Sequence, residues 1–219
     1  MVASPLADIK QMIASKSVGE LSYLPYLMMF SSSCSWSGYA WHISNLVPIG
    51  ITNAINCIIS GYILLKYYTL CSADKKMKVQ LHVTVVSFIV LSFFYYAISN
   101  GEPEFVRSRL GTFSSMMTCI CFVSPLSTMK QVISTKSAAS ISFNLANAGL
   151  ANGCLWILYG ILVADPFMIG PNLLCVASSG LQLLLFNLYS DSRLKKTDSP
   201  TRGGGNNNNT TSSGLLLPQ

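Results

Sequence analysis

Apolar stretches without charge divide the chain into regular segments. No Asp, Glu, Lys or Arg occurs in residues 21–65, 79–101, 110–129, 137–164 or 166–190. A helix that crosses the hydrocarbon core of a membrane needs about 20 largely apolar residues. The first segment is long enough for two such helices and each of the other four for one. The pattern therefore predicts six full transmembrane helices.

The composition points to the same class of protein. Only 10% of the 219 residues are charged and 51% are hydrophobic, whereas about 25% charged residues are usual in a soluble domain. These proportions exclude a soluble enzyme with an ordinary polar surface. We predict an all-α integral membrane protein, surrounded by a lipid bilayer, that is not an enzyme.

The net charge of +6 does not indicate nucleic-acid binding, because the basic residues do not form one face. The basic residues lie between the apolar segments. Along the chain, each lysine-rich loop is followed by a short connection on the opposite side of the membrane. Loops rich in Lys and Arg stay on the cytoplasmic side of a membrane. We therefore expect the loops near 10–20, 70–78 and 129–137, and the C-terminus, to face the cytosol.

An internal repeat organises the apolar segments. At an offset of 120 residues the segment Ser4-Pro5-Leu6 matches Ser124-Pro125-Leu126, and Lys10-Gln11 matches Lys130-Gln131. The same offset brings Cys34, Trp36 and Tyr39 onto Cys154, Trp156 and Tyr159, and after a one-residue slip Asn53 meets Asn172. Agreement that includes rare tryptophans indicates a duplication.

The repeat predicts two parallel three-helix units joined by a linker helix, an arrangement of three, one and three helices. Three is an odd number, so only an inserted helix returns the second unit to the orientation of the first. The second unit has an apolar run, 110–123, before its Ser-Pro, where the first unit has only Val2 and Ala3. The first helix is therefore expected as a stub.

These features give the expected division of the chain. We place the first repeat at 1–69, the cytosolic loop and linker helix at 70–100 and the second repeat at 101–190. Residues 191–219 contain runs of Gly and Asn and are expected to form a disordered cytosolic tail. The seven cysteines show no metal-ligand spacing, and we expect neither a metal nor a cofactor.

The motifs resemble those of the SWEET (saliva-type) sugar facilitators. The shared pattern is Ser-Pro-Leu-x3-Lys-Gln-x4-Lys-Ser, then Trp-x-x-Tyr, then Asp-Pro before Pro-Asn. It covers about residues 3–190 and is strongest over 124–190. The resemblance implies a seven-helix bundle that moves sugar passively by alternating access, often as an oligomer.

A sugar pocket needs amide groups for the hydroxyls and an aromatic wall for the apolar face of the ring. By resemblance, Asn53, Asn172 and Trp156 match positions that hold the substrate. Trp36 matches Trp156 through the internal repeat and would form the opposite wall. The alternatives are amides that bond neighbouring helices and tryptophans that anchor the membrane interface.

Prolines and outer polar residues are candidates for gating. Pro5, Pro25 and Pro125 could act as hinges, since proline removes an internal helix bond. The family has a fourth proline near residue 144, and this sequence has none there. By resemblance, Tyr39, Tyr159 and Asp165 would close the outer mouth, although Asp165 can equally cap the next helix.

The sequence thus predicts a bidirectional uniporter for mono- or disaccharides of the glucose, galactose or sucrose class. We expect a homo-oligomer in the plasma membrane, or else in the Golgi. Proton coupling is disfavoured, because His82 is the one titratable candidate within the spans. An alternative is a carrier of amino acids, but this would require carboxylates within the spans, and the charge-free segments contain none. The remaining alternative is a truncated, non-transporting partner or scaffold.

Overall fold

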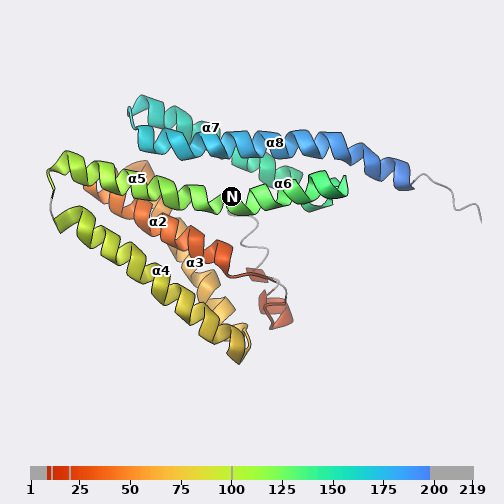
Figure 1. The fold of residues 1–219 in the computed structure, drawn as a ribbon, viewed down its shortest axis with the longest axis horizontal. Helices are drawn as coiled ribbons and strands as arrows, with labels where there is room; N and C mark the ends of the chain where they lie inside the picture. Colours follow the sequence, from red (N-terminus) through yellow and green to blue (C-terminus); the bar gives the residue numbers. More distant parts are fainter. Residues whose placement is uncertain (1–8, 11, 20, 100, 198–219) are drawn as a thin grey trace, which may run out of the picture.

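The described part of the chain is built from helices and short connections. The computed structural model describes residues 9–10, 12–19, 21–99 and 101–197, and within these it contains no strand (Figure 1). The helices in chain order are α2 (Leu24–His42), η1 (Leu46–Gly50), α3 (Ile51–Leu70), α4 (Ala73–Ser99), α5 (Pro103–Cys121), α6 (Val123–Thr135), η2 (Ala138–Ser140), α7 (Phe143–Leu162) and α8 (Pro166–Thr197). The prediction of an all-α membrane protein is confirmed.

Within the described part of the chain, five helical segments are long and apolar enough to cross a membrane, namely Leu46–Leu70, Ala73–Ser99, Pro103–Thr135, Phe143–Leu162 and Pro166–Tyr189. The sixth predicted span corresponds to α2, which has 19 residues but a serine-rich middle. Ser31 and Ser35 are buried, and each hydroxyl donates to a backbone carbonyl one turn earlier. Helix α2 contacts α3, α4 and α5, so its serines face other helices.

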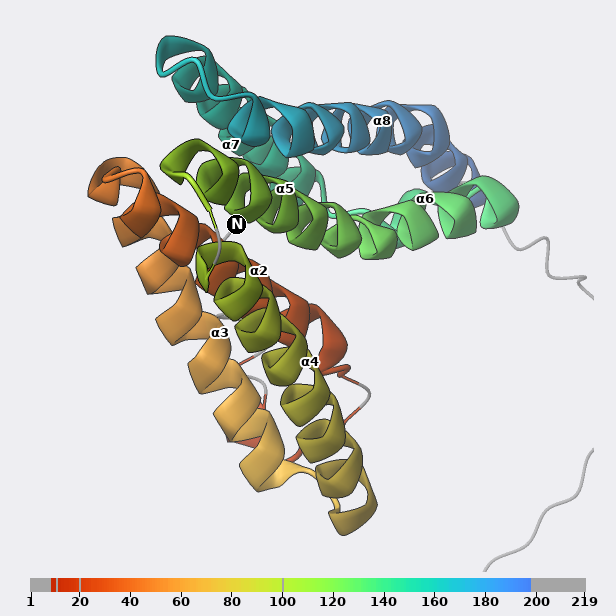
Figure 2. The ribbon, with the colours of Figure 1, turned by 60° about the vertical axis from the view of Figure 1, so that its left-hand side comes forward.

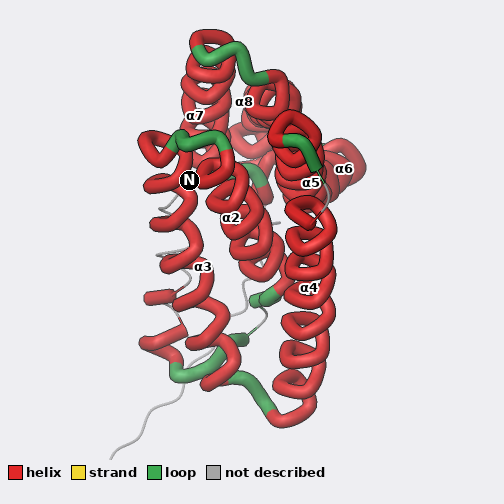
Figure 3. The backbone as a smooth tube through the Cα atoms, turned by 90° about the vertical axis from the view of Figure 1, so that its left-hand side faces the viewer, coloured by secondary structure: helices red, strands yellow, loops and turns green. Residues whose placement is uncertain are grey.

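The helices form two groups that meet along α2 and α5. Helices α2, α3 and α4 lie together on one side, as Figures 2 and 3 show, and α5 to α8 lie on the other. The two groups diverge away from the contact between α2 and α5 (Figure 2). Helices α2 and α3 correspond to α7 and α8 in the repeat, and α4 is the linker helix. The predicted arrangement of three, one and three helices is therefore present.

The predicted first helix falls partly outside the described residues. Residues 9–10 and 12–15 are helical, while 1–8 and 11, with the candidate hinge Pro5, lie outside the described part. In the second repeat the corresponding helix is α5 followed by α6.

Two helices extend beyond the predicted limits. Helix α4 begins at Ala73, so most of the loop expected at 70–78 is helical, with Asp74 in its first turn. Helix α8 continues to Thr197, past the expected boundary at 190. Lys, Leu and Arg are good helix formers, so each helix extends into a polar sequence once the apolar span has nucleated it. Residues 198–219 of the expected tail lie outside the described part.

A helix break divides the first span of the second repeat. Helix α5 ends at Cys121, and α6 begins two residues later. Pro125 has no backbone N–H, so the carbonyl of Cys121 cannot receive the usual bond from four residues ahead. The break therefore has a local cause in the sequence.

Candidate functional site

The two repeats end their second helices with the same backbone turn. At the end of α2, Ser44 has φ 55°, and at the end of α7 Ala164 has φ 51°. The next residue donates its N–H to the carbonyl five residues earlier: Asn45 to Ala40 at 2.9 Å, and Asp165 to Gly160 at 2.8 Å. This is the hydrogen-bond pattern of a Schellman turn. It places Asn45 and Asp165 at equivalent positions.

Each of these residues bonds to a tyrosine of the other repeat. The hydroxyl of Tyr39 donates to Oδ2 of Asp165 at 2.5 Å. The hydroxyl of Tyr159 accepts from Nδ2 of Asn45 at 2.8 Å and lies 3.1 Å from its Oδ1. Tyr39 matches Tyr159 at the same offset that relates Asn45 to Asp165. The two contacts are thus related by the repeat, and both join the repeats at one end of the bundle, here termed the closed end.

Asp165 both caps a helix and joins the repeats. Its Oδ1 accepts from the backbone N–H of Phe167 at 3.0 Å, in the first turn of α8. Its side chain is 2% exposed. The guanidinium of Arg107 lies beside the Tyr39 hydroxyl, to which it can donate, and close to the Asp165 carboxylate. Bonds that involve charged groups are stronger than neutral ones, so this contact is the stronger of the two.

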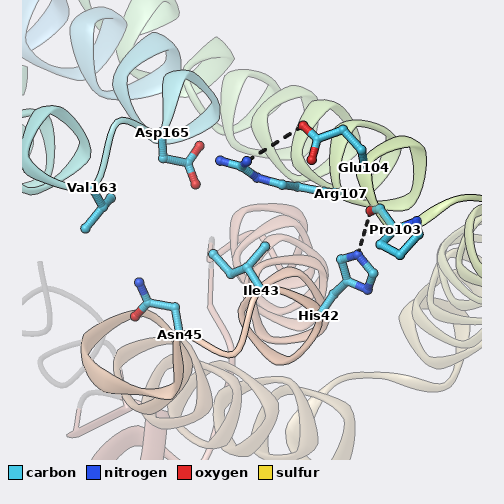
Figure 4. Close-up of a pocket in the computed structure, with 8 residues that line it drawn as sticks. All are labelled: His42, Ile43, Asn45, Pro103, Glu104, Arg107, Val163 and Asp165. Carbon is cyan, nitrogen blue, oxygen red and sulfur yellow. Dashed lines mark hydrogen bonds and ion pairs between the residues drawn. The ribbon is translucent and has the colours of Figure 1, made fainter.

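A polar cavity lies directly against the closed end. It has a volume of about 440 Å³. Its polar walls include Arg107, whose guanidinium is 3.8 Å from Glu104, and His42, whose Nε2 is 3.0 Å from the carbonyl of Pro103. Figure 4 shows these side chains around a common space, with Arg107 directed toward Asp165. The lining residues are His42, Ile43, Asn45, Pro103, Glu104, Arg107, Val163 and Asp165.

The two predicted wall tryptophans make equivalent contacts with a tyrosine. Trp36 packs edge-on against Tyr39 with ring centroids 5.5 Å apart, and Trp156 packs edge-on against Tyr159 at 6.0 Å. Trp36 is buried and its Nε1 donates to Oγ1 of Thr118 in α5 at 2.8 Å. Trp156 is half-buried. Each tryptophan therefore stands one turn from the tyrosine that closes the bundle.

The two predicted amides also share one geometry. Nδ2 of Asn53 donates to the carbonyl of Ile49 at 2.9 Å, and Nδ2 of Asn172 donates to that of Met168 at 2.8 Å. An amide has a second N–H and an acceptor oxygen, so this bond leaves hydrogen-bonding capacity for a ligand. Both side chains are half-buried and lie outside the cavity at the closed end. No hydrogen bond joins the two amides directly among the described residues.

The hinge candidates have different positions. Pro25 is in the first turn of α2, where proline fits without bending the helix. Pro125 follows the break between α5 and α6. Pro171 lies inside α8 and was not considered as a hinge from the sequence. It deprives the Phe167 carbonyl of its helical donor, and Ser115 of α5 donates to that carbonyl at 2.8 Å.

Several residues of the closed end were missed by the sequence reasoning. Asn45 could have been found, because the offset of 120 places it on Asp165. At the offset of 120 residues Arg107 and Thr118 match no residue of the sequence, and no local motif marks them. Their roles follow from the contact between α5 and α2.

Comparisons with known proteins agree with this architecture. The family described as "Sugar efflux transporter for intercellular exchange" matches residues 1–76 and 108–194. The chain is 30% identical over 190 residues to sugar transporter SWEET1 of Dictyostelium discoideum, covering 84% of this chain and 85% of that protein. It is 28% identical to SWEET1 of Rattus norvegicus, covering 86% and 85%. It is 26% identical to the bidirectional sugar transporter SWEET3 of Arabidopsis thaliana, covering 92% and 77%.

The fold has a solved counterpart. A eukaryotic SWEET transporter solved at 3.7 Å resolution matches with a TM-score of 0.79 and 23% identity, over 86% of this chain and 89% of that one. The helices and their cross-repeat contacts define an integral membrane protein of two parallel repeats. The chain belongs to the SWEET family of sugar transporters. Its relatives are transporters, in agreement with the prediction that the chain is not an enzyme.

Proposed function

We propose that this protein is a bidirectional uniporter that carries mono- or disaccharides across a membrane by alternating access. The observation that carries the proposal is the repeat-related pair of contacts, Tyr39 with Asp165 and Tyr159 with Asn45. Both contacts join the two repeats at one end only, as one closed state of an alternating-access carrier requires. Opening would break both contacts while each repeat keeps its own packing.

The proposed sugar site lies further along the bundle from the closed end. Asn53 and Asn172 would bind sugar hydroxyls through the donors and acceptors that their internal bonds leave available. Trp156 and Trp36 would pack against the apolar face of the ring, one from each repeat. The matching tyrosine contacts of the tryptophans and the matching backbone bonds of the amides support this assignment, because a shared cavity would take matching groups from both repeats.

The closed end is proposed to face the outside of the cell or the lumen of the Golgi. The basic connection after α3 and the lysines of α6 lie at the opposite ends of their helices, and such residues favour the cytosolic side. The C-terminus would then be cytosolic. We place the protein in the plasma membrane, or else in the Golgi, as a homo-oligomer. Pro125, after the break between α5 and α6, and Pro171, inside α8, are the proposed hinges about which the second repeat would move.

Sugar uptake tests the proposal. The full chain is expressed in transport-deficient cells, and uptake of radiolabelled glucose, galactose and sucrose is measured with and without a protonophore. A passive uniporter gives uptake that persists with the protonophore. It also gives counterflow, in which unlabelled sugar inside accelerates entry of the label. Correctly folded, membrane-inserted protein with neither uptake nor counterflow for any of these sugars would favour the non-transporting alternative.

A further inference from the structure

The cavity at the closed end has the chemistry of a carbohydrate site. Its walls combine apolar groups, from Ile43, Pro103 and Val163, with hydrogen-bonding side chains. A sugar presents the same combination, hydroxyls around an apolar ring face. The volume of about 440 Å³ falls in the range of about 300–1,000 Å³ found for small-molecule sites.

The charges in this cavity favour a neutral ligand. Asp165 and Glu104 disfavour an anion, while the guanidinium of Arg107 between them disfavours a cation (Figure 4). A hydroxyl both donates and accepts, so a polyhydroxyl ligand can bond to the carboxylates, the guanidinium and the Asn45 amide at once.

We propose that this cavity is a second, entry-side sugar subsite, separate from the site at Asn53 and Asn172. Asp165 and Asn45 belong both to the cavity and to the contacts that close the bundle. A sugar hydroxyl at Asp165 would replace the hydroxyl of Tyr39, and another at Asn45 would replace that of Tyr159. Occupation of the subsite would therefore exchange the contacts that hold the repeats together for contacts to the ligand. The inference rests on the proposed function, because sugar is its ligand.

This exchange has a consequence of definite sign. The Tyr39 hydroxyl competes with the ligand for Oδ2 of Asp165. Tyr39→Phe removes that competitor from Oδ2, while Oδ1 keeps its bond to the Phe167 N–H. Sugar should therefore bind the subsite about tenfold more tightly or better, as expected for one bond to a charged group. A sugar that bound only at the distant amides would gain no such direct advantage.

Labelling of a cysteine in the cavity tests the inference. Val163→Cys and, separately, its repeat counterpart Ile43→Cys are made in the full chain. Each is reacted in detergent with a charged, water-soluble maleimide, with glucose or sucrose present or with glycine betaine at equal osmolarity. Trp41→Cys is the matched control, because Trp41 is 76% exposed at the same end but does not line the cavity. The wild-type rate gives the background from native cysteines.

The expected result is slower labelling of the cavity variants and unchanged labelling of Trp41→Cys. A tenfold excess of sugar over its dissociation constant should slow labelling about tenfold. Sugar should still protect the cavity cysteines from labelling when Asn172→Ala is added. Tyr39→Phe should lower the sugar concentration at which this protection appears. The inference is overturned if both sugars leave the two cavity variants unprotected, or if protection disappears with Asn172→Ala. Because the assay measures binding and not flux, a failure of transport remains distinguishable from a failure of the subsite.

Discussion

The hydroxyl of Tyr39 lies 2.5 Å from Oδ2 of Asp165, and these residues come from different repeats of the chain. The repeat relates this pair to Tyr159 and Asn45, which also bond to each other. One contact includes a buried carboxylate, whereas the other joins two neutral groups. The two halves of the closed end therefore have equivalent geometry but unequal strength, and this difference can be measured.

Removing either tyrosine hydroxyl should open the closed end to different extents. Tyr39→Phe loses a bond to a charged group, about 1.5–3 kcal/mol, and Tyr159→Phe loses a neutral one, about 1 kcal/mol. The open fraction should therefore rise at least tenfold relative to the closed fraction in the first variant and about fivefold in the second. The open fraction would be measured from the distance between two spin labels, carried by genetically encoded non-standard amino acids that replace Trp41 and Leu162. Tyr95→Phe, on the exposed face of α4, should change nothing. An equal response of Tyr39→Phe and Tyr95→Phe would contradict the gate.

The repeat-related amides should matter for transport beyond their effect on the helix. Asn53→Ala and Asn172→Ala are each expected to lower sugar uptake at least tenfold, because each removes groups proposed to bind hydroxyls. Asn147→Ala is the matched control, since Asn147 makes the same bond, to the carbonyl of Phe143 at 3.0 Å, without an amide at its repeat position. Uptake and surface expression are measured together. Similar losses in all three variants would indicate a structural role for the amides.

Ser115 and Pro171 should be energetically coupled. Ser115 supplies the Phe167 carbonyl with the donor that Pro171 cannot provide. Ser115→Ala should lower the free energy of unfolding by about 1 kcal/mol in the natural chain. In the Pro171→Ala background the backbone N–H at position 171 can take over, so the cost should fall close to zero. Unfolding in detergent, followed by circular dichroism, measures this cycle. Additive effects would rule out the compensation, and Ser134→Ala, an exposed serine, is the control.

The close approach of α5 and α8 requires a glycine. A Cβ at Gly111 would lie 2.5 Å from Cγ of Phe167, whereas one at Gly170 would meet no atom within 4 Å. Gly111→Ala should therefore destabilise the protein by about 1–3 kcal/mol through overpacking. Gly170→Ala should be neutral or stabilising, because alanine favours the helix. Thermal unfolding in detergent separates the two, and equal transition temperatures would show that Phe167 moves aside freely.

The candidate site was predictable in part. Tyr39, Tyr159 and Asp165 were expected at a closing contact, and the structure gives them cross-repeat bonds. Asn45 could also have been predicted, because the repeat offset of 120 residues places it on Asp165. Arg107 had no such signal, because at the offset of 120 it matches no residue of the sequence. The predicted roles of Asn53, Asn172, Trp36 and Trp156 in sugar binding remain predictions.

Hydropathy and the internal repeat were enough to predict the class of protein, most of the helical spans and their pairing by repeat. These follow from one-dimensional constraints: a bilayer demands about 20 apolar residues per crossing, and each helix satisfies its own backbone bonds. Which helices meet depends instead on how they pack in three dimensions. The pairing of Tyr39 with Asp165 and of Ser115 with the Phe167 carbonyl depends on how α2, α5 and α8 pack. Such packing depends on the fit of side chains that lie far apart in the sequence, and hydropathy does not encode that fit.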